Sequence, residues 1–304
     1  MKAMGVLIGF MLLGSLSETV VGQEMEPRIY ATLPAGLNFV AVGYARSTGS
    51  VVIDVAVPIE DFRMTMNQGI LGYARAVNLF GRSGMVQVLA PYVHGRAEAV
   101  VAGQDTSRTL TGFADPRIRM SINLLGGPSL TLGEFARYRQ RTIVGVSLQM
   151  TVPLGAYDTS RQLNLGSNRW GFKPEMGVSQ PFKRWTFEVY GGVWLFTENN
   201  AFRGVSTVKQ DPLWTLQGHV IYAFRRRGLW AAFNSTFFSG GKTKVDGVVQ
   251  NSFQANFRFG ATLAVPLAQR HALKAVFSTG VATRFGQDFD SLGLFYQYRW
   301  GGGL

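Results

Sequence analysis

Apolar and polar residues alternate along most of the chain, in segments of about ten residues. From Arg117 to Leu124, every second residue is apolar, and the residues between them are Arg, Ser or Asn. The stretches 214–225 and 292–300 repeat this pattern. Alternation with a period of two is typical of β-strands with one apolar and one polar face. The pattern therefore predicts an all-β protein.

About twelve strands are expected from this alternation and from the turn residues between the segments. They cover residues 37–46, 66–80, 84–97, 115–125, 141–153, 168–180, 184–197, 212–225, 228–239, 250–265, 271–285 and 290–300. The connections alternate in length. The short ones are 81–84, 181–183, 226–227 and 266–270, and the long polar ones are 46–65, 98–114, 154–167 and 198–211. Residues 126–140 are a long connection where a short one is due, and 131–139 are expected to form a short helix there.

Short turns on one side and long loops on the other are typical of outer-membrane barrels. Aromatic residues such as Trp170, Trp214 and Trp300 lie near the ends of the apolar faces, as an interfacial girdle requires. The opposite faces carry charged and amide side chains in mid-strand, which suits a wet lumen. The sequence thus predicts a transmembrane antiparallel up-and-down β-barrel of about twelve strands, with short periplasmic turns and longer extracellular loops. A soluble all-β fold also alternates and is the alternative.

Composition narrows the fold class further. Only 16% of the residues are charged, 37 are Gly and none is Cys. The aromatic and aliphatic content excludes disorder, and the absence of Cys excludes a disulfide scaffold. No uninterrupted apolar run beyond residue 22 reaches the 20 or so residues of a spanning helix. Glycines on the lumen faces are expected to relieve crowding in a barrel of modest diameter; they are Gly145, Gly177, Gly192 and Gly260.

Residues 1–22 have the pattern of a secretory signal peptide, with Lys2 followed by an apolar stretch and small residues up to Gly22. A buried N-terminal helix is the alternative. Residues 23–304 are then one exported barrel domain. The net charge of +12 could indicate nucleic acid, but the basic residues do not cluster on a helix or tail. Many fall in the predicted turns 183–184, 225–227 and 270–271, where they contact anionic headgroups or are simply solvated.

Three stretches resemble a known family. They are 112–119 (GFADPRIR), 133–140 (GEFARYRQ) and the segment from Asn164 to Gly177, which contains Asn168, Arg169 and Trp170. They resemble the MetA-pathway of phenol degradation family of transporter-like outer-membrane proteins, and the likeness covers nearly all of residues 23–304. The resemblance implies an outer-membrane barrel that admits hydrophobic or aromatic compounds. One departure is the end of the chain, where Trp300 is followed by a tail of three Gly and Leu304.

A set of polar residues on the predicted lumen faces is the candidate solute path. It consists of Arg117, Arg119, Arg169, Lys173, Glu175, Gln217, His219, Arg258, Lys274, Arg284 and Arg299. Such residues could impose a positive field that favours anionic solutes, or they could pair across strands and fill a plugged barrel. Four aromatic residues in or near mid-strand face either the lumen or lipid: Tyr190, Trp194, Phe196 and Trp230.

No catalytic, metal or cofactor site is predicted. The chain has three His, at 94, 219 and 271, and the parity of Ser235 places it on the opposite face from His219. There is no Cys, no HExxH and no close His pair for a metal. The function expected is a passive outer-membrane channel of a Gram-negative bacterium, for small aromatic or anionic molecules. A surface-interaction barrel is the alternative, and a barrel enzyme a more distant one. The expected partners are outer-membrane lipid, a small solute and the barrel-assembly machinery, which reads the last strand; we expect a monomer.

Overall fold

The computed structural model describes residues 25–52, 59–101, 103–161, 163–226 and 228–304. The predicted signal peptide lies outside these residues. Twelve long antiparallel strands form the wall. They are β1 (Leu37–Val52), β2 (Ile59–Leu79), β3 (Arg82–Val101), β5 (Arg117–Leu125), β6 (Ile143–Thr151), β7 (Gly171–Phe182), β8 (Trp185–Phe196), β11 (Leu213–Ala223), β12 (Trp230–Gly240), β15 (Gln254–Pro266), β16 (His271–Ala282) and β17 (Gly286–Gly301).

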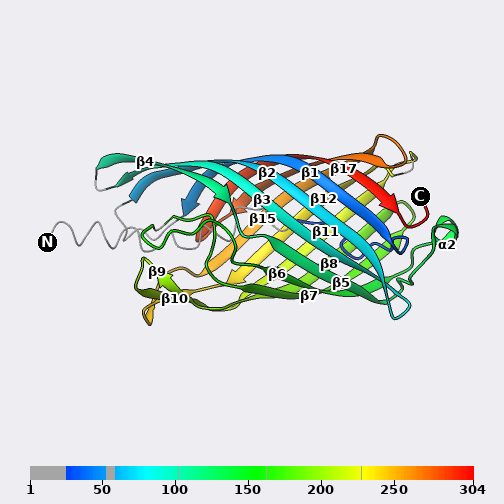
Figure 1. Ribbon diagram of the computed structural model, residues 1–304, viewed down its shortest axis with the longest axis horizontal. Helices are drawn as coiled ribbons and strands as arrows, with labels where there is room; N and C mark the ends of the chain where they lie inside the picture. Colours follow the sequence, from blue (N-terminus) through cyan, green and yellow to red (C-terminus); the bar gives the residue numbers. More distant parts are fainter. Residues whose placement is uncertain (1–24, 53–58, 102, 162, 227) are drawn as a thin grey trace.

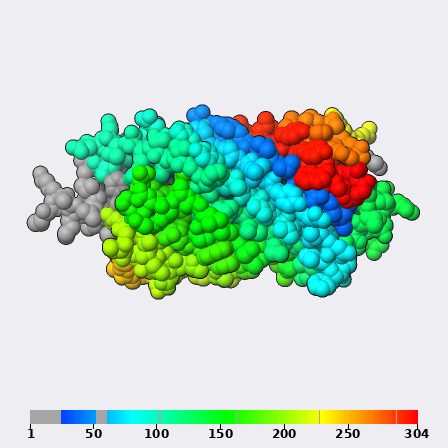
Figure 2. All heavy atoms as spheres, viewed as in Figure 1, coloured from blue at the N-terminus to red at the C-terminus, as the bar shows by residue number. Residues whose placement is uncertain are grey.

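The wall is a closed ring. Each long strand pairs with its neighbours in sequence, and β1 pairs with β17 from Leu37↔Gly301 to Val52↔Gly286. Closure leaves no free edge in the membrane, where an unpaired backbone group costs several kcal/mol. The predicted up-and-down barrel of about twelve strands is confirmed. The side chains form a continuous outer surface on the face in view (Figure 2).

The two ends of the barrel differ as the connection lengths predict. One end carries the tight turns, the C-terminus and the short helix α2 (Leu132–Arg137). The other carries β4 (Gln104–Phe113), β9 (Asn199–Phe202), β10 (Ser206–Gln210), β13 (Thr243–Val245) and β14 (Val248–Val249), of which Figure 1 labels the first three. By the usual polarity of such barrels, the first end is periplasmic. The basic turn residues Lys183, Arg226 and Arg270 all lie there.

The tight turns have the backbone that a two-residue hairpin requires. Leu79 pairs with Arg82 across Phe80 and Gly81, whose φ angles are 54° and 77°. Positive φ at both central residues is the twist that matches flanking strands. Glycine adopts it without strain, which is why Gly81 ends the turn.

Apolar side chains form a belt around the outside. On β17 the exposed fractions are 64% at Leu292, 55% at Leu294 and 43% at Tyr296. The nine residues from Leu292 to Trp300 span roughly 27 Å along the strand, which at the usual tilt of about 40° is a rise of roughly 20 Å, close to the apolar band of about 25 Å of an outer-membrane barrel. Tyr298 and Trp300 stack at its periplasmic margin, and Trp170 and Trp214 lie at the opposite margin. Among the described residues, no helix is both long and apolar enough to be a membrane span.

Three predicted loops are largely strand instead. The loop predicted at 198–211 contains β9 and β10. Residues 46–52 continue β1, β2 begins at Ile59, and residues 98–101 and 104–113 belong to the paired strands β3 and β4. In the extensions of β1 to β4, most outward residues are polar, so the alternation that marks a membrane strand ends. The inward residues remain apolar. Phe62, Met64 and Val101 are buried inside the barrel with Leu110. This inner cluster continues the strands beyond the membrane belt.

The predicted short helix at 131–139 is confirmed as α2. Thr131 caps it, and the carboxylate of Glu134 accepts from the Thr131 backbone N–H at 2.7 Å. Tyr138 donates to the carbonyl of Gly126 at 2.7 Å, which fixes the helix beside the strand ends. The C-terminal tail lies at the same mouth, where Leu304 packs against Leu37 and its neighbours.

Candidate functional site: a lumen crossed by the N-terminal segment

Residues 25–32, which we call the plug segment, lie inside the barrel. Glu26 pairs with Arg119 of β5, and the ring of Tyr30 meets Tyr190 of β8 edge-on at 5.2 Å. Arg28 stacks on Trp230 of β12 at 5.4 Å. At its start, the segment reaches Gly260 of β15. Since β5 and β15 are opposite each other in the ring of twelve strands, the segment crosses the lumen.

The wall carries glycine at three points where the plug segment sits. A Cβ on Gly145 would be 2.2 Å from the Tyr30 ring, and one on Gly177 would be 2.4 Å from it. A Cβ on Gly260 would be 2.6 Å from the sulfur of Met25. Three of the four lumen glycines singled out in the sequence therefore seat the segment. The fourth, Gly192, leaves room for Lys173.

Side chains and single backbone groups hold the plug segment to the wall. The backbone N–H of Arg28 donates to Glu188 at 2.7 Å, and Asn123 donates to the carbonyl of Tyr30 at 3.0 Å. The Tyr30 hydroxyl lies 3.3 Å from that of Ser147. The segment pairs with no strand in the described part of the chain. The segment is thus held to the wall by side-chain contacts and not by sheet pairing.

A polar cluster lines the wall on the extracellular side of the segment. Lys173 and Glu175 of β7 form an ion pair of 2.6 Å with both side chains almost fully buried. Gln217 of β11 donates to the same carboxylate at 3.0 Å. His219 is the next inward-facing residue of β11, and its Nδ1 lies 2.9 Å from Oδ1 of Asn234 on β12. Within the described residues, Oε1 of Glu175, Oε1 of Gln217 and Oγ1 of Thr215 have no hydrogen-bond partner.

Aromatic side chains adjoin this cluster. Tyr190 and Trp194 of β8 are 0% and 7% exposed, and they lie beside Gln217 and Leu213 of β11 in the register. Trp194 stacks on Phe196 at 6.1 Å. With Trp230 beside the plug segment, all four aromatics that the sequence left undecided face the lumen.

A long connection folds into the extracellular half of the lumen. Leu163 and Leu165 join the inner apolar cluster. Asp115 anchors this connection: its Oδ1 accepts from the N–H of Gly155 at 2.8 Å, and its Oδ2 accepts from the N–H of Ser167 at 2.7 Å. Asp115 lies in the stretch 112–119 and Ser167 in the segment from Asn164 to Gly177, both of which resemble the known family. These stretches therefore include the hydrogen bonds that hold the connection to the wall.

The structure brings most of the predicted lumen residues together. Six are buried inside the barrel: Arg119, Lys173, Glu175, Gln217, His219 and Arg258. Arg117 and Lys274 are half-buried on the same faces. Arg169 is buried in the connection before β7, where it bonds to Gln210 and stacks on Phe196. The two pairs Arg119–Glu26 and Lys173–Glu175 fit the pairing alternative better than an uncompensated positive field.

Two residues of the predicted lumen set, Arg284 and Arg299, do not lie in the middle of the lumen. Arg284 is exposed in the turn between β16 and β17 and stacks on Phe253 at 5.1 Å, so it is not a mid-lumen residue. Strand β16 ends at Ala282 because the turn to β17 needs those residues. Arg299 is at the periplasmic end, where it donates to the carbonyl of Gln269 at 2.7 Å.

The alternation of apolar and polar residues did not indicate the plug segment. Its residues do not alternate, and the two prolines and one tyrosine among 27–34 favour no single element. The available signal was the set of lumen glycines on adjacent strands, since a row of missing side chains implies that something else occupies the space.

The Ser235–His219 pair that a barrel enzyme could use does not form. Ser235 faces outward and donates to the carbonyl of Gly218, on the opposite face from His219, which is the placement predicted from their positions along the strands. The described residues also hold no group of three or more potential metal ligands.

The comparisons with known proteins agree with this geometry. Residues 43–296 match the model of the MetA-pathway of phenol degradation family. The chain belongs to this family. No curated protein matches it significantly.

Among solved structures, the chain is similar to an outer-membrane channel from Pseudomonas putida F1, with a TM-score of 0.74 and 23% identity over 91% of this chain and 100% of that one. It is also similar to the transport unit of the autotransporter AIDA-I from Escherichia coli, with a TM-score of 0.53 and 8% identity over 94% and 95%. At these identities the likeness shows the fold. Together with the apolar belt, this fold places the family member in the Gram-negative outer membrane.

Proposed function

We propose that this family member is a passive channel for small molecules, closed at rest by its own plug segment. The observation that carries this proposal is the plug itself. The wall leaves space across the lumen, and that space is filled by a segment that shares no strand pairing with the wall. A barrel built only for rigidity would fill its lumen with wall side chains, as small barrels do. A detachable insert instead suits a pore that opens.

The lining favours small aromatic solutes with a hydrogen-bond donor over simple anions. The buried cations Arg119 and Lys173 are paired with Glu26 and Glu175, so little positive field is left for an anion. The ring faces of Tyr190 and Trp194 offer stacking contacts. The Oε1 atoms of Glu175 and Gln217, which have no partner among the described residues, can accept a hydrogen bond from a solute hydroxyl group. These features support the aromatic option among those the sequence left open.

Flux through the refolded protein in liposomes tests this proposal. We expect phenol-sized hydroxylated aromatics to enter faster than benzoate-like or sulfonate anions of equal size. Trp194→Ala and Gln217→Leu should each reduce the preference for the hydroxylated solute, whereas Leu294→Ala on the lipid-facing side is the matched control. Equal entry of both solute classes, or no change in the variants, would contradict the proposed selectivity.

The remaining partners follow from the outer surface. In this proposal the chain acts as a monomer, because the belt is apolar around the wall and suits lipid. The last strand β17, with its aromatic residues up to Trp300, is the element that the barrel-assembly machinery would read. The basic periplasmic turns would contact anionic headgroups. No catalytic step is assigned.

A further inference from the structure

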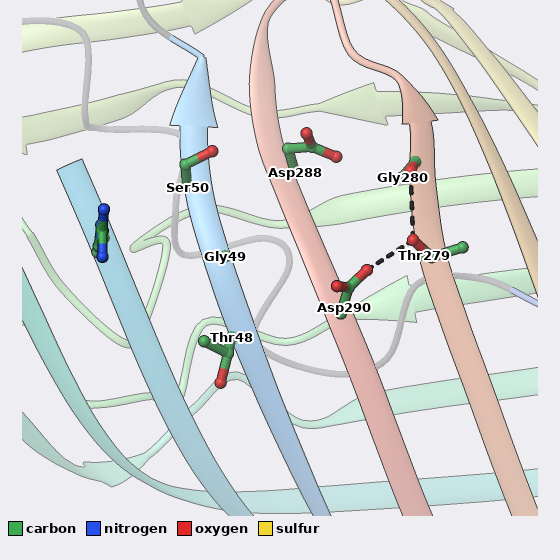
Figure 3. Close-up of a pocket in the computed structure, with 8 residues that line it drawn as sticks. Thr48, Gly49, Ser50, Thr279, Gly280, Asp288 and Asp290 are labelled. Carbon is green, nitrogen blue, oxygen red and sulfur yellow. Dashed lines mark hydrogen bonds between the residues drawn. The ribbon is translucent and has the colours of Figure 1, made fainter. Parts of the chain in front are cut away.

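A hollow of about 420 Å³ opens on the outer wall of the barrel, across β1, β2, β16 and β17. Figure 3 shows its lining: Thr48, Gly49, Ser50, Arg63, Thr279, Gly280, Asp288 and Asp290. Apart from the two glycines, these positions alternate with residues buried inside the barrel, such as Ser47, Met64 and Phe289. The hollow therefore faces away from the lumen and is separate from the proposed solute path.

The hollow lies just beyond the extracellular margin of the apolar belt. Below it, Tyr44, Phe277 and Leu292 are 53%, 46% and 64% exposed to the surroundings. Above them, the outward residues change to Thr48, Thr279 and Asp290. A charge facing hydrocarbon costs about 2–4 kcal/mol at the bilayer midplane and little near the interface. This change of polarity places the hollow at the headgroup level of the outer leaflet.

Cations and acceptors both surround the hollow. Arg63 lines it, and Arg46 is two residues from Thr48 on the same face of β1, about 7 Å along the strand. Both arginines are exposed, and neither side chain has an ion pair or hydrogen bond within the described chain. Asp290 accepts from the Thr279 hydroxyl at 2.6 Å, and Asp288 from Thr283 at 3.2 Å. Each carboxylate keeps further lone pairs for a ligand.

This combination selects among the headgroups that meet a barrel at this level. A guanidinium binds a phosphate through two parallel hydrogen bonds, while carboxylates and hydroxyls bind sugar hydroxyl groups. A simple anion or an anionic glycerophospholipid would use the arginines and be repelled by Asp288 and Asp290. A sugar that carries a phosphate uses both sides. The volume also falls within the range of about 300–1,000 Å³ that is usual for small-ligand sites.

We infer that this hollow binds the phosphorylated sugar headgroup of lipopolysaccharide in the outer leaflet. Arg46 and Arg63 hold the phosphate, and Asp288 and Asp290 accept hydrogen bonds from the sugar hydroxyl groups. Thr48 and Ser50 complete the polar lining. The site orients the barrel in the outer leaflet and does not depend on whether the lumen conducts.

Binding to defined lipids tests the inference on the refolded full barrel. Native mass spectrometry would count bound lipopolysaccharide, and titration would give its apparent Kd, with phosphatidylglycerol as the comparison lipid. We expect the Arg46→Ser/Arg63→Ser double variant and Asp290→Asn each to weaken lipopolysaccharide binding at least about tenfold. Ser50→Trp, which fills the hollow without removing a charge, should do the same.

The controls are Arg137→Ser on α2 and Asp105→Asn at the tip of β4, which change the same charges outside the hollow. Both should bind as the wild type does. Heat-modifiable migration on a gel shows that each variant is folded. The inference is overturned if folded hollow variants bind lipopolysaccharide like the controls. It is also overturned if phosphatidylglycerol binds as tightly as lipopolysaccharide and shows the same losses.

Discussion

Single glycine residues determine where the lumen can be filled. Gly145 and Gly177 face each other across β6 and β7, and the Tyr30 ring occupies the space that their missing side chains leave. The three atoms nearest to a Cβ at Gly145 all belong to Tyr30, whereas a Cβ at Gly177 would also be 2.3 Å from Tyr190 of the wall. Gly145 is therefore the position at which the plug can be displaced with little effect on the barrel.

We predict that Gly145→Val releases the plug segment from the lumen. Overpacking costs about 1–3 kcal/mol, which corresponds to roughly a 5- to 150-fold change in the open population. Limited trypsin digestion after Arg28 measures it, since this bond is inside the folded barrel. Cleavage should be fast in the variant and slow in the wild type. Gly191→Ala, whose Cβ would meet nothing within 4 Å, is the control; equal rates in all three proteins would contradict the prediction.

Individual residues also show what the sequence could and could not predict. The alternation placed His219 inward and Ser235 outward correctly, because parity within a strand is a local property. It could not place Tyr30, since that contact joins residues 117 apart in sequence through Ser147. It misplaced Arg284, because the end of a strand depends on its turn. Side-chain direction was predictable, and what fills the space inside was not.

Among the elements, the helix α2 depends for its stability on a titrating group outside the membrane. The Thr131 backbone N–H and hydroxyl both donate to the Glu134 carboxylate, at 2.7 and 2.8 Å. These bonds hold the pKa of Glu134 below its ordinary value. The helix is beside the periplasmic mouth, where a Cβ on Gly303 of the C-terminal tail would be 3.3 Å from Leu132.

We predict that α2 frays as the pH falls. Because the pKa of Glu134 is lowered in the folded protein, the cap stabilises the helix above the pKa of the unfolded chain and is lost as the pH falls through the folded pKa. Hydrogen exchange of the amides in 132–138 should be faster at pH 3 than at pH 6, after correction for intrinsic rates. In Glu134→Gln this difference should largely disappear. Equal pH dependence in both proteins would show that the cap does not stabilise α2.

Elements were predictable where both faces follow the alternation and less so where one face changes. All twelve wall strands were expected, and so was the helix in the long connection. The extensions of β1 and β2 and the hairpin of β3 and β4 were expected as loops, because their outward residues are polar. Their inward residues, such as Met64 and Val101, remain apolar and pack inside. A polar outer face marks the end of the membrane, and an apolar inner face continues the strand.

At the scale of the whole molecule, three layers close the lumen. Leu304 and Leu33 pack at the periplasmic mouth, the plug segment crosses the middle, and the connection that contains Leu163 and Leu165 fills part of the extracellular half. In the proposed channel, the net charge of +12 leaves little positive field in mid-lumen, because Arg119 and Lys173 are paired with Glu26 and Glu175 and much of the remaining charge is in turns. In the proposed channel, the plug segment closes a pathway that the wall leaves open.

Conductance across a planar bilayer tests this claim most directly. We would compare the refolded wild type with a variant that lacks residues 25–32, after heat-modifiable migration shows that both barrels are folded. The account predicts small or intermittent conductance for the wild type and a larger, steady conductance for the deletion variant. A folded deletion variant that conducts no more than the wild type would contradict it.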